Sequence, residues 1–186
     1  MSRMTENAAG AAVSNSVLQG GRRKAYRPLP QLERREAVDS ALAAWARGDW
    51  FETHELLEPA WMGTADPAER DLYQGLIKLA AAFVHQVRGN RAGVTKNLVG
   101  ARERIAAAAA EAVDRDGDVE GFEPAALLPA FVALERQAAA GAPGAPGATG
   151  AIATAARPLV RADRLGSPVA PAIPGLTPPV LRRTSP

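Results

Sequence analysis

The chain has 186 residues, a formal net charge of +2 and no cysteine. This length suits one domain with a hydrophobic core, and the lack of cysteine excludes disulfides, thiolate nucleophiles and zinc sites with cysteine ligands. The positive excess comes largely from arginines in the two ends of the chain, so it is weak evidence for nucleic-acid binding, which we do not expect. No apolar run is long enough to predict a membrane span, and no charged segment followed by an apolar one predicts a secretory signal. We therefore expect a cytoplasmic protein.

Both ends of the chain are predicted to be disordered. Residues 1–28 are rich in Ala, Ser, Asn and Gly and become basic near their end, whereas residues 140–186 are rich in Pro, Gly and Ala. Neither stretch has enough patterned apolar residues to offset the entropy that is lost on ordering. The folded domain is therefore expected to cover residues 29–139, between a basic arm and a long tail.

Five helices are predicted in this domain, because apolar residues recur at steps of three and four. The predicted helices cover residues 32–47, 50–62, 68–88, 91–114 and 124–137. Asp49, Asp66 and Asn90 stand where each could begin a helix, and Asp49 and Asp66 can cap it. Pro59 should end or bend the second helix in its last turn. The predicted fold class is all-α, a compact helical bundle.

An internal repeat groups the first four helices into two pairs. Arg47-Gly48-Asp49 recurs as Arg88-Gly89-Asn90, each time after a helix that carries an aromatic residue, Trp45 or Phe83. A glycine at this position is typical of the turn between two antiparallel helices. The pattern predicts two helix-turn-helix units of the tetratricopeptide (TPR) kind. Two units are too few for an extended solenoid, so we expect them to pack into a compact bundle.

Six aromatic residues gather on the first three predicted helices. They are Trp45, Trp50, Phe51, Trp61, Tyr73 and Phe83. Core packing is the first interpretation, since aromatic side chains bury large apolar areas. A partner-binding groove lined by some of them is the alternative.

A cluster of polar residues lies on the second and third predicted helices. Its members are Glu52, His54, Glu55, Glu58 and Trp61 on the second helix and Gln74, Lys78, His85 and Arg88 on the third. His54 and Glu58 are four residues apart and therefore share one helix face. Because a short turn joins the two helices, we expect an antiparallel pair. Either Gln74 and Lys78 then lie near Glu58 and Trp61, or His85 reaches His54.

Two interpretations of this polar cluster stay open. The first is a network in which carboxylates pair with His, Lys and Arg across the helices and fix how the helices dock. The second is a divalent-metal site formed by His54, Glu58 and His85, with Glu55 as a fourth ligand or general base. The segment resembles the His-Glu-x-x-His motif of zinc proteases, but Glu58 stands where that motif has its second histidine. Arg88 either stabilises a helix C-terminus or binds an anion.

The motifs around this cluster resemble the domain-of-unknown-function family 309. That family has an aromatic-x-x-Gly-x-aromatic-Phe-Glu-x-His-Glu-x-x-Glu-x-x-Trp helix, then Leu-Gln-Gly-Leu-Ile-Gln, then His and Arg-Gly-Asn. The matching positions here are Phe51, Glu52, His54, Glu55, Glu58, Trp61, Gln74, Gly75, His85, Arg88, Gly89 and Asn90. The resemblance covers about residues 38–105. It implies a small all-helical fold and a bacterial cytoplasmic setting, and it supplies no activity.

Two positions depart from the family pattern. Lys78 stands where the family has glutamine, and Tyr73 stands where it has leucine. A lysine would repel a metal ion beside it, so Lys78 favours a salt bridge with a glutamate of the second helix.

The first function predicted is a non-enzymatic binding or scaffold module. It would use the polar and aromatic surface of the second and third helices to bind a protein or a small molecule, and a homo-oligomer stays open. The alternative is a metal-dependent, hydrolase-like enzyme that holds a divalent metal as its cofactor and uses His54, Glu55, Glu58 and His85. No contact with a membrane is expected.

Overall fold

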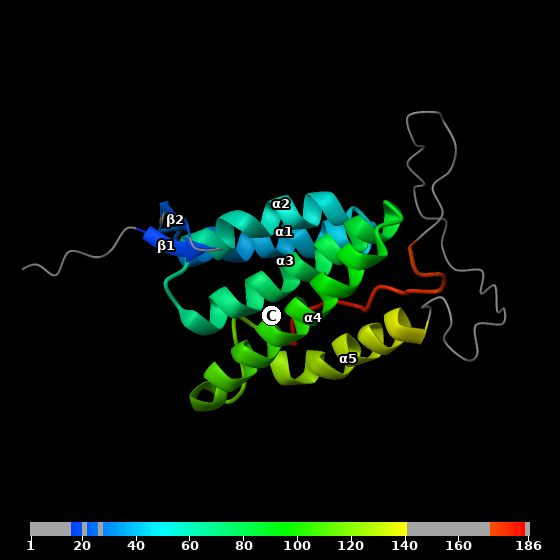
Figure 1. Cartoon of the computed structure of the whole chain (residues 1–186). Coiled ribbons are helices and arrows are strands. Elements are labelled where there is room, and N and C mark those ends of the chain that lie inside the picture. The colour runs from blue at the N-terminus through cyan, green and yellow to red at the C-terminus, as the bar shows by residue number, and fades with distance from the viewer. Residues whose placement is uncertain (1–15, 20–21, 26–27, 141–171, 185–186) are drawn as a thin grey trace, which may run out of the picture.

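The computed structural model of the chain describes residues 16–19, 22–25, 28–140 and 172–184 (Figure 1). Five α-helices form one bundle. Their bounds are α1 Gln31–Ala46, α2 Trp50–Gly63, α3 Pro67–Val87, α4 Arg91–Glu111 and α5 Pro124–Ala140, with a short 3-10 helix at Val113–Arg115 between the last two. The structure confirms the five predicted helices and the all-α fold class.

Three of the helices begin at residues that the sequence singles out. Asp49, Asp66 and Asn90 each accept a hydrogen bond from the backbone N–H three residues later, at 3.0, 3.1 and 2.9 Å. Gly48 and Gly89, which follow α1 and α3, have φ angles of +78° and +69°. A left-handed residue just after a helix turns the chain back on itself. The pairs α1–α2 and α3–α4 are therefore helical hairpins, although their likeness to tetratricopeptide units stays a prediction.

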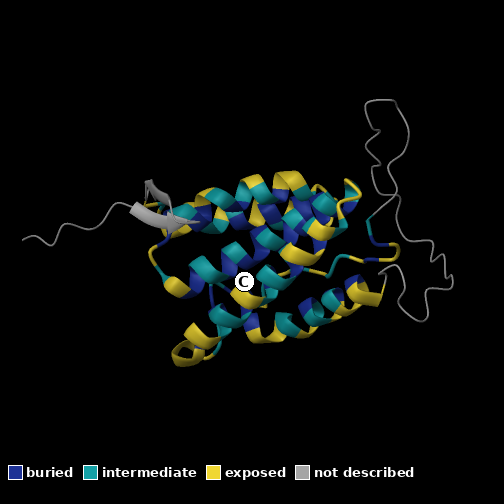
Figure 2. Ribbon diagram, in the orientation of Figure 1, coloured by how far each residue is buried: buried dark blue, intermediate teal, exposed yellow. Residues whose placement is uncertain are grey.

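Each helix packs mainly against its neighbours in the sequence: α1 against α2, α2 against α3, α3 against α4 and α4 against α5. The long helix α3 contributes more buried residues than any other helix, and Figure 2 shows buried residues on the inward faces of the bundle. At Gly75 of α3 an added Cβ would lie only 2.8 Å from Cδ1 of Ile105, so the missing side chain lets α4 approach closely. None of the described helices is long and apolar enough to span a lipid bilayer.

Most of the aromatic residues that the sequence predicts to be in the core are buried there. The buried ones are Trp45, Trp61, Tyr73 and Phe83. Trp45, Trp50 and Phe83 form a cluster with ring centroids 4.7 to 5.4 Å apart, and Trp45 meets both other rings edge-on, which suits their quadrupoles. Phe51 is the exception to the predicted core, because its side chain is 58% exposed.

Pro59 does not end the second helix. It lies inside α2, which continues to Gly63. A proline costs a helix one backbone hydrogen bond, and burial of Ala60 and Trp61 in the core stabilises the turn that follows it.

The N-terminal stretch contains structure that the composition did not reveal. Two strands, β1 Ser16–Gln19 and β2 Arg22–Ala25, pair in antiparallel register within the predicted arm. The sequence between them is Gly20-Gly21, a dipeptide typical of two-residue hairpins. The remaining expectation of disorder for residues 1–15 lies outside the described residues.

The end of the predicted tail packs against the bundle. Within residues 172–184, Ile173 is fully buried and Leu176 is only 9% exposed. The prediction of disorder is therefore wrong for this segment, because the bundle supplies burial that the composition of the segment alone does not reveal. Residues 141–171, also predicted to be disordered, lie outside the described residues.

Candidate functional site

A partly open pocket of about 150 Å³ lies where α2, α3 and α4 meet. Its lining residues are His54, Glu58 and Trp61 from α2, Gln74, Ile77, Lys78 and Ala81 from α3, and Asn97 from α4. On both α2 and α3 the lining residues follow one another at steps of three and four, which keeps them on one helix face. Trp61 and Ile77 are buried, whereas the polar lining residues are half-buried. The pocket thus combines an apolar part with several accessible polar groups.

Two opposite charges face this pocket without pairing. Glu58 and Lys78 both line it, yet among the described residues neither has a hydrogen-bond or ion-pair partner. The salt bridge predicted between Lys78 and a glutamate of the second helix is therefore not formed. Instead, the Lys78 side chain lies across Gly100 of α4, where an added Cβ would be 3.1 Å from its Nζ atom. A carboxylate and an ammonium remain available to a ligand.

The other polar groups of the pocket are partly engaged. Nδ1 of His54 lies 3.2 Å from a carboxylate oxygen of the exposed Glu55. Nδ2 of Asn97 donates to the carbonyl oxygen of Gly93 at 2.9 Å, which orients the side-chain carbonyl of Asn97 away from that bond. The pocket therefore offers hydrogen-bond donors and acceptors as well as charge.

The predicted metal site is not assembled. His54 and Glu58 line the pocket, whereas His85 lies near the far end of α3, with Nδ1 3.1 Å from Nδ2 of Asn90 and its ring against Gly93. Within the described ranges no three His, Asp or Glu side chains are placed to hold a metal ion. The reason is helix register: the α3 residues that share the pocket with His54 end at Ala81, about one turn before His85. The predicted ligands His54, Glu58 and His85 therefore do not come together in the described part of the chain.

The other predicted site residues lie outside the pocket lining. Glu52 is close to its own helix start and forms an exposed ion pair with Arg47 at 3.3 Å. Glu55 is more than half exposed and contacts only His54 among the described residues. Arg88 is exposed just after α3. The predicted site residues do not include Ile77, Ala81 and Asn97, because two of these are apolar and the third lies on α4, outside the two helices of the predicted cluster.

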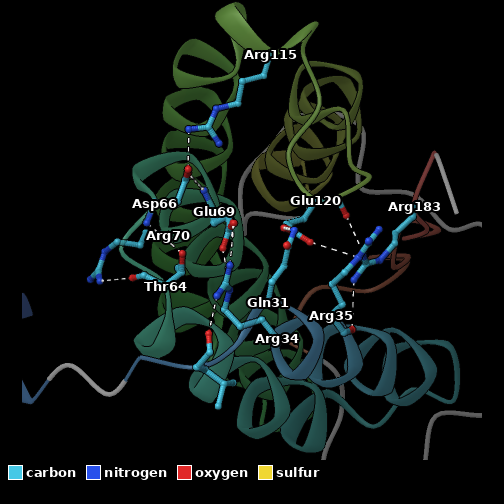
Figure 3. Close-up of polar contacts among 11 residues, drawn as sticks. Gln31, Arg34, Arg35, Thr64, Asp66, Glu69, Arg70, Arg115, Glu120 and Arg183 are labelled. Carbon is cyan, nitrogen blue, oxygen red and sulfur yellow. Dashed lines mark hydrogen bonds and ion pairs between the residues drawn. The ribbon is translucent and has the colours of Figure 1, made fainter.

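A buried polar cluster at the junction of α1 and α3 was also missed. Arg34 of α1 donates to both carboxylate oxygens of Glu69 on α3, at 3.0 and 3.2 Å, and to the carbonyl oxygen of Leu29 at 2.6 Å (Figure 3). Burial would lower the pKa of Arg34, but the hydrogen bond and negative charge of Glu69 outweigh burial and raise that pKa. This two-pronged pair fixes α1 against α3.

Tyr73 lies close to this pair. Its hydroxyl is fully buried and has no hydrogen-bond partner in the described structure. Burial raises the pKa of Tyr73, and the carboxylates of Glu69 and Glu120 raise it further. Glu120 itself accepts a hydrogen bond from Gln31 at 2.7 Å and lies 3.4 Å from Nε of Arg35. No local motif signals such contacts, because the partners are far apart in the sequence.

Comparison with known proteins gives one match, to a family model. No curated protein and no solved structure matches the chain. One family model does match, over residues 38–97, and it is described as a domain of unknown function (DUF309). The matched region runs from the middle of α1 into α4 and contains every residue that lines the pocket. The match confirms, over residues 38–97, the resemblance to this family that the motifs show.

Proposed function

We propose that the domain is a non-enzymatic binding module that takes one polar side chain of a partner protein into the pocket between α2, α3 and α4. The observation that carries the proposal is the presence of Glu58 and Lys78 in one pocket, where neither has a partner in the part of the chain that the structure describes. A half-buried charge loses hydration, and an unpaired one gains nothing in exchange. A ligand group that satisfies both charges would recover that free energy through charge-assisted hydrogen bonds.

The volume of the pocket limits the size of its ligand. Sites for drug-sized molecules measure roughly 300–1,000 Å³, whereas this pocket measures about 150 Å³. It has room for one side chain or a molecule of a few heavy atoms. A substrate of metabolite size would project into solvent, which favours a binding role.

The charges favour a primary carboxamide, the side chain of asparagine or glutamine. Its NH₂ group can donate to Glu58, and its oxygen can accept from Lys78. An acidic side chain would pair with Lys78 but meet Glu58, and a basic one would do the reverse. The neutral carboxamide also avoids the cost of removing a third charge from water.

An exposed aromatic residue beside the pocket supports a protein partner. Phe51 lies three residues before His54 on α2, which places it next to the pocket on the same helix face. Its side chain is 58% exposed, and aromatic residues are enriched among those that dominate binding free energy at protein interfaces. The alternative of a metal-dependent hydrolase has no comparable support, because its proposed ligands are not gathered.

The test uses blocked single amino acids as probes of the pocket. The probes are the Nα-acetyl amides of glutamine, glutamate, lysine and norleucine, and binding is followed by NMR shifts of the side-chain amides of Gln74 and Asn97. At about −0.3 kcal/mol per heavy atom, a probe of about thirteen such atoms should bind with a Kd of about 1 mM. We expect saturable shifts with the glutamine probe, weaker binding of the charged probes and none of norleucine.

Two variants separate the pocket from the rest of the surface. Ala81→Leu fills the pocket from its α3 side and should abolish the shifts. Ala109→Leu makes the same change at a half-buried residue of α4 outside the pocket lining and should leave binding intact. Binding that survives Ala81→Leu, or a response to norleucine equal to that of glutamine, would refute the proposal.

A further inference from the structure

The C-terminal segment, residues 172–184, packs along the bundle (Figure 1, red), and we call the surface that it covers, from Gln86 past Trp45 to Gly121, the groove. The main helix pairs follow the sequence order, and α1 and α5, at the two ends of that order, do not form such a pair with each other. The segment starts at the end of α3, passes α1 and ends at the turn before α5, as its hydrogen bonds to Gln86, Trp45 and Gly121 show. It therefore covers a surface that the helices alone leave open.

The first end of the segment is recognised through its backbone. The Gln86 side chain donates to the carbonyl oxygen of Ile173 at 2.5 Å and accepts from the N–H of the same residue at 3.0 Å. The N–H of Ala172 donates to the backbone oxygen of Gln86 at 2.9 Å. The side chains of Ile173 and Leu176, three residues apart, are the buried anchors. A buried carboxamide that forms hydrogen bonds with both the N–H and the C=O of one residue binds a peptide through its backbone.

The middle of the segment is held by an indole. Nε1 of Trp45 donates to the carbonyl oxygen of Pro179 at 2.9 Å. Pro178 precedes it, and consecutive prolines favour the extended polyproline conformation, which leaves backbone carbonyls free to accept. The neighbouring Val180 is 82% exposed and makes no use of the groove.

The far end of the segment is anchored by an arginine. Arg183 donates to the backbone oxygens of Glu120 at 2.8 Å and of Arg35 at 3.3 Å (Figure 3). Its Nε atom lies 3.0 Å from Asp39, and its guanidinium lies over the ring of Phe122 at 5.6 Å. Although it is an arginine, its side chain is only 11% exposed.

The turn that receives this end has an unusual backbone. Val119 and Phe122 are joined by two backbone hydrogen bonds, and between them Glu120 and Gly121 have φ angles of +53° and +82°. A non-glycine residue in the left-handed region is disfavoured, and such residues often occur at binding sites. The carbonyl oxygen of Gly121 accepts from both the N–H and the hydroxyl of Thr184, at 2.6 and 3.0 Å.

We propose that this groove is a peptide-recognition site and that residues 172–184 are its resident ligand. The site takes a non-helical peptide with an aliphatic residue, a second aliphatic residue three positions later, prolines whose carbonyls accept from Trp45, and an arginine for the turn at Glu120. Every contact described above is non-covalent and joins a separate stretch of chain to the bundle. The tether gives the resident segment a high effective concentration, so a peptide in trans competes once the tether is cut.

The test cuts the tether after the full chain has folded. A recognition sequence for a specific protease is inserted between Gly150 and Ala151, and the cleaved protein is mixed with a fluorescent peptide that copies residues 172–186. Fluorescence anisotropy measures entry of the peptide, and far-UV circular dichroism measures the helices. We expect saturable exchange of the peptide with helix content unchanged. The peptide with Ile173→Ala should bind at least tenfold more weakly, and the peptide with Val180→Ala should bind as the natural one does.

Several results would overturn the proposal. Loss of helix content when the cleaved fragment leaves would make the segment a fixed part of the fold, and failure of the peptide to enter would do the same. Equal binding of the Ile173→Ala peptide would remove the recognition. On the bundle side, Gln86→Leu keeps a similar volume without the hydrogen bonds and should weaken the natural peptide at least tenfold. A dimer of the uncut chain that Ile173→Ala disperses would place the segment of a second copy in the same groove and support the site.

Discussion

Gly75 allows close contact of α3 with α4, and replacing it with alanine tests how tightly the two helices fit. An ideal Cβ at this position would lie 2.8 Å from both Cδ1 and Cγ1 of Ile105 and 3.3 Å from the backbone oxygen of Ala101. Ile105 is fully buried, and the χ1 angle of a β-branched side chain in a helix has one strongly preferred value. The backbone oxygen cannot move without moving α4. Neither neighbour can yield cheaply.

The expected cost of Gly75→Ala follows from two opposing terms. Overpacking a core costs about 1–3 kcal/mol, whereas alanine is favoured over glycine in a helix by about 1 kcal/mol. We therefore expect a net loss of about 1 kcal/mol in the free energy of unfolding. Gly100→Ala is the matched control, because its Cβ would meet the flexible end of Lys78 at 3.1 Å. That lysine can move aside, so this variant should gain about 0.5–1 kcal/mol.

Urea unfolding, followed by far-UV circular dichroism, measures both changes as shifts of the midpoint at constant slope. A double variant adds a second check, since Ile105→Val removes the Cδ1 atom that the new methyl group would strike. The loss caused by Gly75→Ala should be smaller in the Ile105→Val background than in the natural one. A Gly75→Ala protein as stable as the natural one, or losses that simply add, would refute the tight fit.

Three further predictions concern ionisable groups near α3. Arg34→Met should cost about 3 kcal/mol in urea unfolding because it leaves the carboxylate of Glu69 buried and unpaired, and Arg34→Met with Glu69→Met should cost less than the sum of the two single changes. Burial raises the pKa of Tyr73, so the folded state keeps the phenol proton to higher pH than the unfolded state does. The free energy of unfolding should therefore fall as pH rises above about 10. Tyr73→Phe should flatten this decline and leave stability at neutral pH unchanged or slightly higher. Burial alone would raise the pKa of Asp66, but the hydrogen bonds from Arg115 and from the backbone of Glu69 lower it. Its contribution is therefore present above about pH 4 and lost as pH falls, so Asp66→Asn should be less stable than the natural chain at pH 7 and equal to it at the lowest pH that keeps the fold.

The helices could be predicted because their signals are local. Asp49 and Asp66 lie directly before the helices that they cap, and the apolar residues of each helix recur at helical steps. Gly48 and Gly89 mark hairpin turns for the same reason, because only their own φ angles are involved. Burial of Trp45 also follows from its place on an apolar stripe. Each of these features depends on residues within one or two helical turns.

The site could be predicted only in part, because it depends on the register between helices. His54, Glu58 and Lys78 line one pocket, because His54 and Glu58 share one face of α2 and Lys78 lies on the α3 face beside it. His85 was wrongly added, because the sequence does not state how far α3 slides along α2, and one helical turn decides which residue faces His54. The pairing of Arg34 with Glu69 has the same origin. Contacts between helices that are distant in the sequence have no signature in residue spacing.

The pocket and the groove differ in how they relate to the family match. All residues that line the pocket lie within 38–97, the stretch that the family model matches. The groove is only half inside it: Trp45 and Gln86 belong to the matched stretch, whereas Gly121 and the segment 172–184 lie beyond it. Trp45 and Gln86 belong to the matched helices, so their side chains can bind a peptide backbone with or without the C-terminal segment. Which peptide lies there depends on the residues that follow the matched stretch. The pocket should therefore keep its function in a chain that lacks this tail, and the groove should then be free for a peptide from another chain.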